Sequence, residues 1–103
     1  MKSQKMTRTE KEYVLDTVSN ELYRIMRESG IKEWVKGEIR GLLFRIDEKR
    51  ITKATVERYV HSIRWLKKEA YEINEYETVK EAHKIGLFLC DRFNLAYSGI
   101  VIE

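Results

Sequence analysis

Residues 51–73 read ITKATVERYVHSIRWLKKEAYEI, and this segment carries the strongest structural signal in the 103-residue chain. Its regularly spaced apolar residues are Val56, Tyr59, Ile63, Leu66, Ala70 and Ile73. Successive members of this set lie three or four residues apart, which is the spacing of one side of an α-helix. The segment therefore predicts a helix that begins at Thr52 or Thr55, ends near Asn74 and turns its aliphatic side to the core.

The opposite side of this predicted helix is cationic and contains a tryptophan. It carries Arg58, His61, Trp65, Lys68 and Glu72, with Lys53 and Arg64 on its flanks. Trp65 has two interpretations, which the sequence leaves open. The ring is buried if a neighbouring helix covers it; otherwise Trp65 marks a partner-binding surface together with Tyr71, since Trp and Arg are enriched among residues that carry binding energy.

Residues 52–60, TKATVERYV, form the pattern T-x-x-T-V-x-R-Y-V. This pattern resembles the second helix of helix-turn-helix DNA-binding domains. The resemblance implies a cap at Thr52, inward positions for Val56 and Val60, and DNA-facing positions for Lys53, Thr55 and Arg58. The same stretch of sequence, followed by IRWL at residues 63–66, is similar to the helical DNA-clamping domain that precedes the catalytic domain of tyrosine recombinases. Either resemblance implies DNA binding without catalytic residues.

The charge distribution agrees with an anionic partner. The net charge is +3, and residues 45–68 are the most positive part of the chain. Asymmetry of this kind favours binding to a polyanion. The nucleic-acid-binding residues that we predict are Lys49, Arg50, Lys53, Thr55, Arg58, His61, Arg64 and Lys68. The alternative is an ordinary solvated face in which Arg58, Arg64, Lys67 and Lys68 pair with nearby acids such as Glu57, Glu69 and Glu72.

The rest of the chain predicts three further helices. Residues 1–8 are expected to be a flexible basic arm, and residues 9–103 a single domain. A capping box formed by Thr9 and Glu12 predicts a first helix up to residue 29, which Gly30 ends in the left-handed conformation. A second capping box, formed by Thr78 and Glu81, predicts a last helix over residues 79–93.

The second helix is expected over residues 32–45, and its apolar residues spread around most of the circumference. We therefore expect it to be the most enclosed helix, with a neighbouring helix close to Gly37 and Gly41 to offset the cost of two glycines. A short strand over residues 41–46 is the alternative. The β-branched residues 100–102 predict a short extended C-terminal tail.

The sequence does not favour catalysis, a cofactor or a metal. His83 and Cys90 share one side of a helix, but two ligands without a paired motif are a weak signal for zinc. The single cysteine and the lack of a long apolar run or signal-like segment indicate a cytoplasmic protein. The fold class that we predict is all-α, a compact four-helix domain with a helix-turn-helix-like core.

The predicted function is duplex DNA binding by a small regulator of transcription or replication, with the start of the central helix in the major groove. A homodimer is expected, because helix-turn-helix proteins commonly pair two reading helices. The second hypothesis is a protein–protein adaptor or inhibitor that binds its partner through Trp65 and the surrounding cations.

Overall fold

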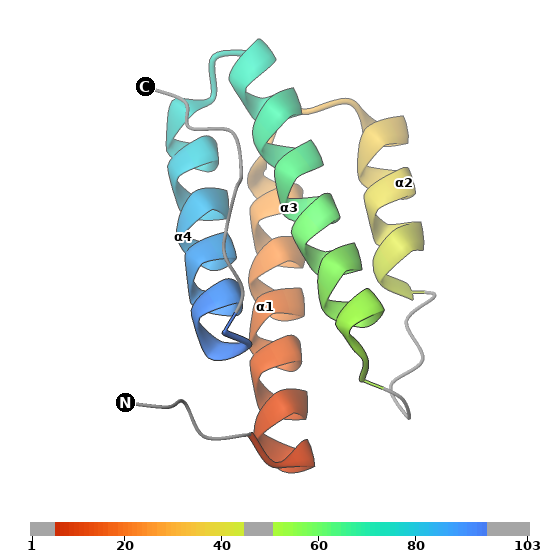
Figure 1. Cartoon of the computed structure of the whole chain (residues 1–103). Helices are drawn as coiled ribbons and strands as arrows, with labels where there is room; N and C mark the ends of the chain where they lie inside the picture. Colours follow the sequence, from red (N-terminus) through yellow and green to blue (C-terminus); the bar gives the residue numbers. More distant parts are fainter. Residues whose placement is uncertain (1–5, 45–50, 95–103) are drawn as a thin grey trace.

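The computed structural model describes residues 6–44 and 51–94. Within these ranges the chain forms four α-helices, namely α1 (Arg8–Glu28), α2 (Glu33–Phe44), α3 (Lys53–Glu72) and α4 (Tyr76–Arg92). Figure 1 shows that each helix runs in the opposite direction to the preceding one, as in an up-down-up-down bundle. The predicted all-α, four-helix fold is confirmed.

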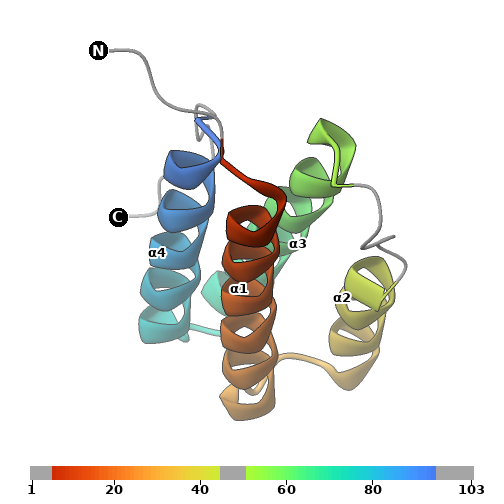
Figure 2. The ribbon, with the colours of Figure 1, turned by 90° about the horizontal axis from the view of Figure 1, so that it is seen from below.

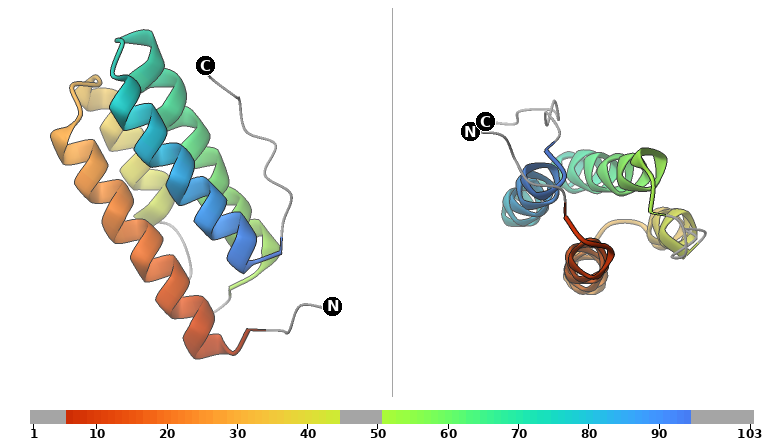
Figure 3. Two further views of the ribbon diagram at one scale, coloured as in Figure 1. Left: turned by 90° about the vertical axis from the view of Figure 1, so that its left-hand side faces the viewer. Right: turned by 60° about the horizontal axis from the view of Figure 1, so that its bottom comes forward.

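The four helices surround a shared core in the order of the chain, as the end-on views show (Figures 2 and 3). α3 packs most extensively against α4, and α1 packs against α4 on the other side. The packing of α3 against α2 is less extensive. Only residues 73–75 separate α3 from α4, so the two form a tight antiparallel hairpin.

The core is aliphatic and draws on every helix. Its fully buried members include Val18, Leu22, Met26, Val35, Ile39, Ile63, Leu66, Ala70, Ala82 and Leu89. The predicted inward side of α3 is confirmed from Val56 to Ala70, but Ile73 is 40% exposed. The reason is that α3 ends at Glu72 and Asn74 turns the chain with a φ of 65°.

The first helix begins two residues earlier than its predicted cap. Thr7 accepts a hydrogen bond from the Glu10 amide at 3.1 Å, and the Glu10 carboxylate accepts one from the Thr7 amide at 2.7 Å. The capping box is therefore Thr7 with Glu10, and the predicted pair of Thr9 and Glu12 is wrong. Both pairs fit the T-x-x-E pattern, so the sequence alone does not separate them.

The end of α1 is fixed by the turn between α3 and α4. The Glu75 carboxylate accepts hydrogen bonds from the Ser29 hydroxyl and from the Gly30 amide, both at 2.6 Å. Gly30 is not left-handed, contrary to our prediction. A Cβ at this position would lie 2.8 Å from the Glu75 Oε2, so a glycine is needed for close approach rather than for its backbone conformation.

The buried lysine of α2 belongs to the same turn. The Nζ of Lys36 donates to the Ser29 carbonyl oxygen at 2.7 Å and pairs with Glu33 at 3.2 Å. Burial alone would raise the pKa of Glu75, but hydrogen bonds from Ser29, Gly30 and Thr78 and the charge of Lys36 outweigh it and lower that pKa. Both inter-helix turns at this end of the bundle therefore share one hydrogen-bond network.

α2 is more open than predicted. Trp34 is 63% exposed, and among the described residues no atom from outside the backbone of α2 lies within 4 Å of a Cβ built at Gly37 or Gly41. The expected enclosure and the expected close approach of a neighbour are both wrong, because these three positions share the side of α2 that faces away from the core. Residues 41–44 are helical, so the helix interpretation is confirmed there.

α4 also begins earlier than predicted, at Tyr76 with Glu75 as its N-cap residue. Thr78 and Glu81 do not form the predicted capping box. Instead Thr78 donates to Glu75 at 3.2 Å, and Glu81 pairs with Arg24 of α1 at 3.1 Å. The predicted extended tail at residues 100–102 lies outside the described residues.

The helix-turn-helix core is not confirmed. That motif joins two helices at about 90–120° by a turn of three or four residues. Here α2 and α3 run side by side in opposite directions (Figure 1), and residues 45–52 separate them. The arrangement around α3 is that of an antiparallel bundle.

Candidate nucleic-acid interface on α3

The start of α3 is defined by two threonines. The Thr52 hydroxyl accepts from the Thr55 amide at 3.4 Å, and the Thr55 hydroxyl accepts from the Thr52 amide at 3.2 Å. This reciprocal pair fixes the first turn, as a capping box does. The 20 residues of α3 extend over about 30 Å at the helical rise per residue.

Thr55 is a predicted nucleic-acid contact whose burial opposes its predicted role. Its side chain was expected to face DNA, yet the residue is only 8% exposed. Its hydroxyl is engaged in the capping box with Thr52, inside the first turn of α3. Thr55 therefore shapes the helix start, and the expectation that it is directed outward is wrong.

Four predicted contacts do lie on the surface. The exposed members of the set are Lys53, Arg58, His61 and Lys68. In the described part of the chain, none of Lys53, Arg58 and Lys68 is within ion-pair distance of a carboxylate. Glu57 and Glu72 are exposed on the same helix, so the face is mixed in charge. We call the four exposed residues the α3 cationic face.

The remaining predicted residues divide into three groups. Arg64 is half-buried, so only part of its side chain is available at the surface. Tyr71 is 41% exposed, and its ring lies edge-on to Tyr76 with 5.6 Å between the ring centroids. Lys49 and Arg50 lie outside the described residues.

Trp65 combines both of its interpretations. The ring packs against the buried core cluster, but the residue remains half-buried rather than enclosed. The ring of His61, one turn earlier on α3, lies 6.1 Å from it in a tilted arrangement. The indole therefore joins the core to the α3 cationic face.

The sequence interpretation missed a buried basic pair between α3 and α4. Lys67, placed among the solvated cations, is 1% exposed, and its Nζ lies 2.9 Å from the Nδ1 of His83. Burial, with the nearby charge of Arg64, lowers the pKa of Lys67. Burial, with the charge of Lys67, lowers the pKa of His83. Lys67 and His83 therefore lose their protons more readily in the folded chain than the same side chains do in water.

The spacing of Lys67 contained a signal for its burial. Lys67 follows Ile63 by four residues and precedes Ala70 by three, so it lies at the edge of the buried side of α3. Cys90 faces the same interface from α4, and burial raises the pKa of its thiol. A buried thiol of this kind is protonated and unreactive.

Among the described residues, no three His, Cys, Asp or Glu side chains lie close enough together to hold a metal ion. None of the described helices is both long enough and apolar enough to span a bilayer.

The chain was compared with known proteins at the level of sequence and of fold. No family model, no curated protein and no solved structure matches it.

Proposed function

We propose that this chain binds duplex DNA through the α3 cationic face. The observation that supports this proposal is that Lys53, Arg58 and Lys68 are exposed and lack a carboxylate partner in the described part of the chain. Unpaired surface cations neutralise phosphates and release condensed counterions, which drives affinity without sequence preference.

The first turns of α3 are the part proposed to approach the bases. α3 starts at an end of the bundle (Figure 1), so its N-terminal turns can enter a major groove about 12 Å wide. On a duplex of random sequence Lys53, Arg58 and Lys68 would contact phosphates. On a preferred sequence Arg58 and His61, which lie one turn apart there, carry donors suited to base edges. Lys68, three turns beyond Arg58, would then contact the phosphate backbone. A role in regulating transcription or replication, with two α3 helices paired in a dimer, is part of the same proposal.

The salt dependence of binding tests the proposal. Three phosphate contacts predict that the association constant for a random-sequence duplex falls about 40-fold between about 50 and about 200 mM salt. Fluorescence anisotropy of a labelled duplex measures this directly. Affinity that is absent at low salt, or that is unchanged over this range, would contradict the proposal.

A charge-matched pair of variants locates the interface. The double substitution Lys53→Ala with Arg58→Ala removes two of the three phosphate contacts. The slope of the logarithm of the association constant against the logarithm of the salt concentration should therefore become shallower by about 2. The control removes two exposed cations elsewhere, by Lys32→Ala with Lys84→Ala, and keeps the same net charge. Equal losses in the two double variants would show that total charge, and not the α3 cationic face, causes the binding.

A partner protein is the second candidate, and one observation favours it. Tyr71 and Tyr76 form an edge-to-face pair beside Ile73, and all three are at least 40% exposed. An exposed aromatic cluster of this kind is a typical protein-binding feature. A contact centred on this cluster would be far less sensitive to salt than DNA binding, so the titration above separates the two candidates.

A further inference from the structure

A pocket opens where three helix ends meet. The up-down-up-down order brings the start of α1, the start of α3 and the end of α4 to the same end of the bundle (Figure 1). The pocket has a volume of about 250 Å³. The residues that line it are Lys11, Ile51, Thr52, Lys53, Val56 and Phe93.

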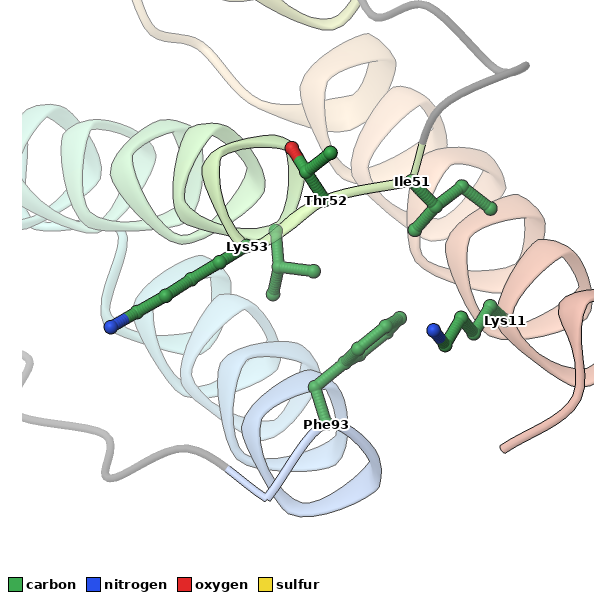
Figure 4. Close-up of a pocket in the computed structure, with 6 residues that line it drawn as sticks. Lys11, Ile51, Thr52, Lys53 and Phe93 are labelled. Atoms are coloured by element: carbon green, nitrogen blue, oxygen red, sulfur yellow. The ribbon is translucent and has the colours of Figure 1, made fainter. Parts of the chain in front are cut away.

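The lining combines an apolar interior with positive charge. Ile51, Val56 and Phe93 supply aliphatic and aromatic surface, whereas both charged residues of the lining are lysines. Figure 4 shows Lys11 and Phe93 pointing toward each other across the pocket, while the side chain of Lys53 extends outward from α3. No described carboxylate lies within ion-pair distance of Lys11 or Lys53.

We infer that this pocket binds a small carboxylate whose apolar body is about the size of one aromatic ring. An apolar cavity of about 150 Å³ accommodates benzene, so a pocket of about 250 Å³ holds a ring with a short acidic arm. The ring would lie against Val56 and Phe93. The carboxylate would meet the ammonium group of Lys11, and Lys53 can turn its flexible chain to the same charge.

Each part of this recognition makes a separate demand on the ligand. The apolar lining requires an apolar group on the ligand, since ligand pockets are mostly apolar and bury most of the ligand surface. The lysines require a negative charge at one end. A neutral molecule of the same shape satisfies only the first demand, and acetate satisfies only the second. Phenylacetate satisfies both.

The test is a ¹⁵N-resolved NMR titration of the whole chain with phenylacetate, benzyl alcohol and acetate. A ligand of this size is expected to bind with a Kd of about 1 mM, so about 10 mM saturates the pocket. Phenylacetate should shift the amide signals of Lys11, Thr52, Val56 and Phe93. Benzyl alcohol should bind about two- to fivefold more weakly, which is the contribution of one partly exposed ion pair. Acetate should cause no localised shift.

Variants separate the charge from the cavity. Lys11→Ala should weaken phenylacetate binding by about two- to fivefold and leave benzyl alcohol binding unchanged. Lys32→Ala removes an exposed cation elsewhere and should change neither. Val56→Phe fills the pocket and should abolish the binding of phenylacetate and of benzyl alcohol. If this variant does not fold, the comparison of Lys11→Ala with Lys32→Ala still tests the inference.

Three results would overturn the inference. They are the lack of localised shifts at about 10 mM phenylacetate, equal affinity for benzyl alcohol, and unchanged phenylacetate affinity in Lys11→Ala. DNA takes no part in any of these measurements, so their outcome is independent of the proposed function.

Discussion

The Nζ of Lys67 lies 2.9 Å from the Nδ1 of His83, and this contact joins α3 to α4 inside the bundle. Two basic groups at this distance cannot both be protonated without strong repulsion, since burial already disfavours charge. When His83 is neutral with its proton on Nε2, its Nδ1 accepts a hydrogen bond from the Lys67 ammonium group. Protonation of His83 would remove this hydrogen bond and place two positive charges side by side.

The stability of the fold should therefore decrease in mildly acidic solution. The pKa of His83 is lowered from 6.5 in the folded chain, so the unfolded chain binds the proton first as the pH falls. By linkage the free energy of unfolding decreases once the pH drops below about 6.5. Urea unfolding followed by circular dichroism at about pH 8 and about pH 5.5 measures the change.

The two histidines of the chain provide a matched control for this prediction. His61 is exposed on α3, so His61→Gln should keep the pH dependence of the wild type. His83→Gln should lower the stability at neutral pH and remove most of the dependence between about pH 8 and about pH 5.5. An unchanged pH profile in His83→Gln would refute the assignment.

A second prediction concerns Glu75 and Gly30, which are 45 positions apart and in direct contact. Glu75→Gln replaces a charged acceptor of three hydrogen bonds and should lower the free energy of unfolding by about 2 kcal/mol. Glu77→Gln is the control, because Glu77 is exposed and forms a surface pair with Lys80. That change should stay within about 0.5 kcal/mol.

Gly30→Ala should show that the two residues act together. The added Cβ displaces the carboxylate from the Gly30 amide, and we expect a loss of about 1 kcal/mol in the wild type. In a Glu75→Ala background the same substitution should cost little, because the group that it displaces is gone. Additive losses in the double variant would contradict the proposed contact.

The positions of the helices followed from the sequence, because the spacing of apolar residues reports which side of a helix is buried. Val56, Ile63 and Leu66 lie inside as their spacing predicts. The pattern does not report which neighbour covers the edge of that side. Lys67 is buried because α4 covers it, and the closeness of α4 depends on the short turn at residues 73–75.

The candidate site was predictable to the same extent. Exposure of Lys53, Arg58 and Lys68 follows from their place opposite the aliphatic side. The role of Thr55 was not predictable. Either threonine at the helix start fits a cap, and only the structure shows that both take part. The contact of Glu75 with Gly30 depends on tertiary packing, and no local pattern encodes it.

The open side of α2 leads to a third prediction, with the opposite sign. In the described ranges 6–44 and 51–94, a Cβ at Gly37 or Gly41 meets no atom within 4 Å beyond the backbone of its own helix, and neither glycine has a positive φ. Gly37→Ala and Gly41→Ala should therefore each raise the free energy of unfolding by about 0.5–1 kcal/mol, because alanine loses less entropy in a helix. Thermal melting of both variants tests this; a loss of stability in either would indicate a close contact at that side.

The two tryptophans provide the last prediction, since they have different degrees of burial. Trp65 is half-buried against the core, so Trp65→Ala should cost about 2 kcal/mol, which is less than the 3–5 kcal/mol of a fully buried aromatic residue. Trp34 is 63% exposed, so Trp34→Ala should stay within about 0.5 kcal/mol. Urea unfolding measures both differences: the midpoint concentration gives the change in the free energy of unfolding when the slope of that free energy against urea concentration is unchanged. A loss of 4 kcal/mol or more for Trp65→Ala would place the ring wholly in the core. It would also leave the exposed Tyr71 and Tyr76 pair, without the indole, as the aromatic surface available to a partner protein.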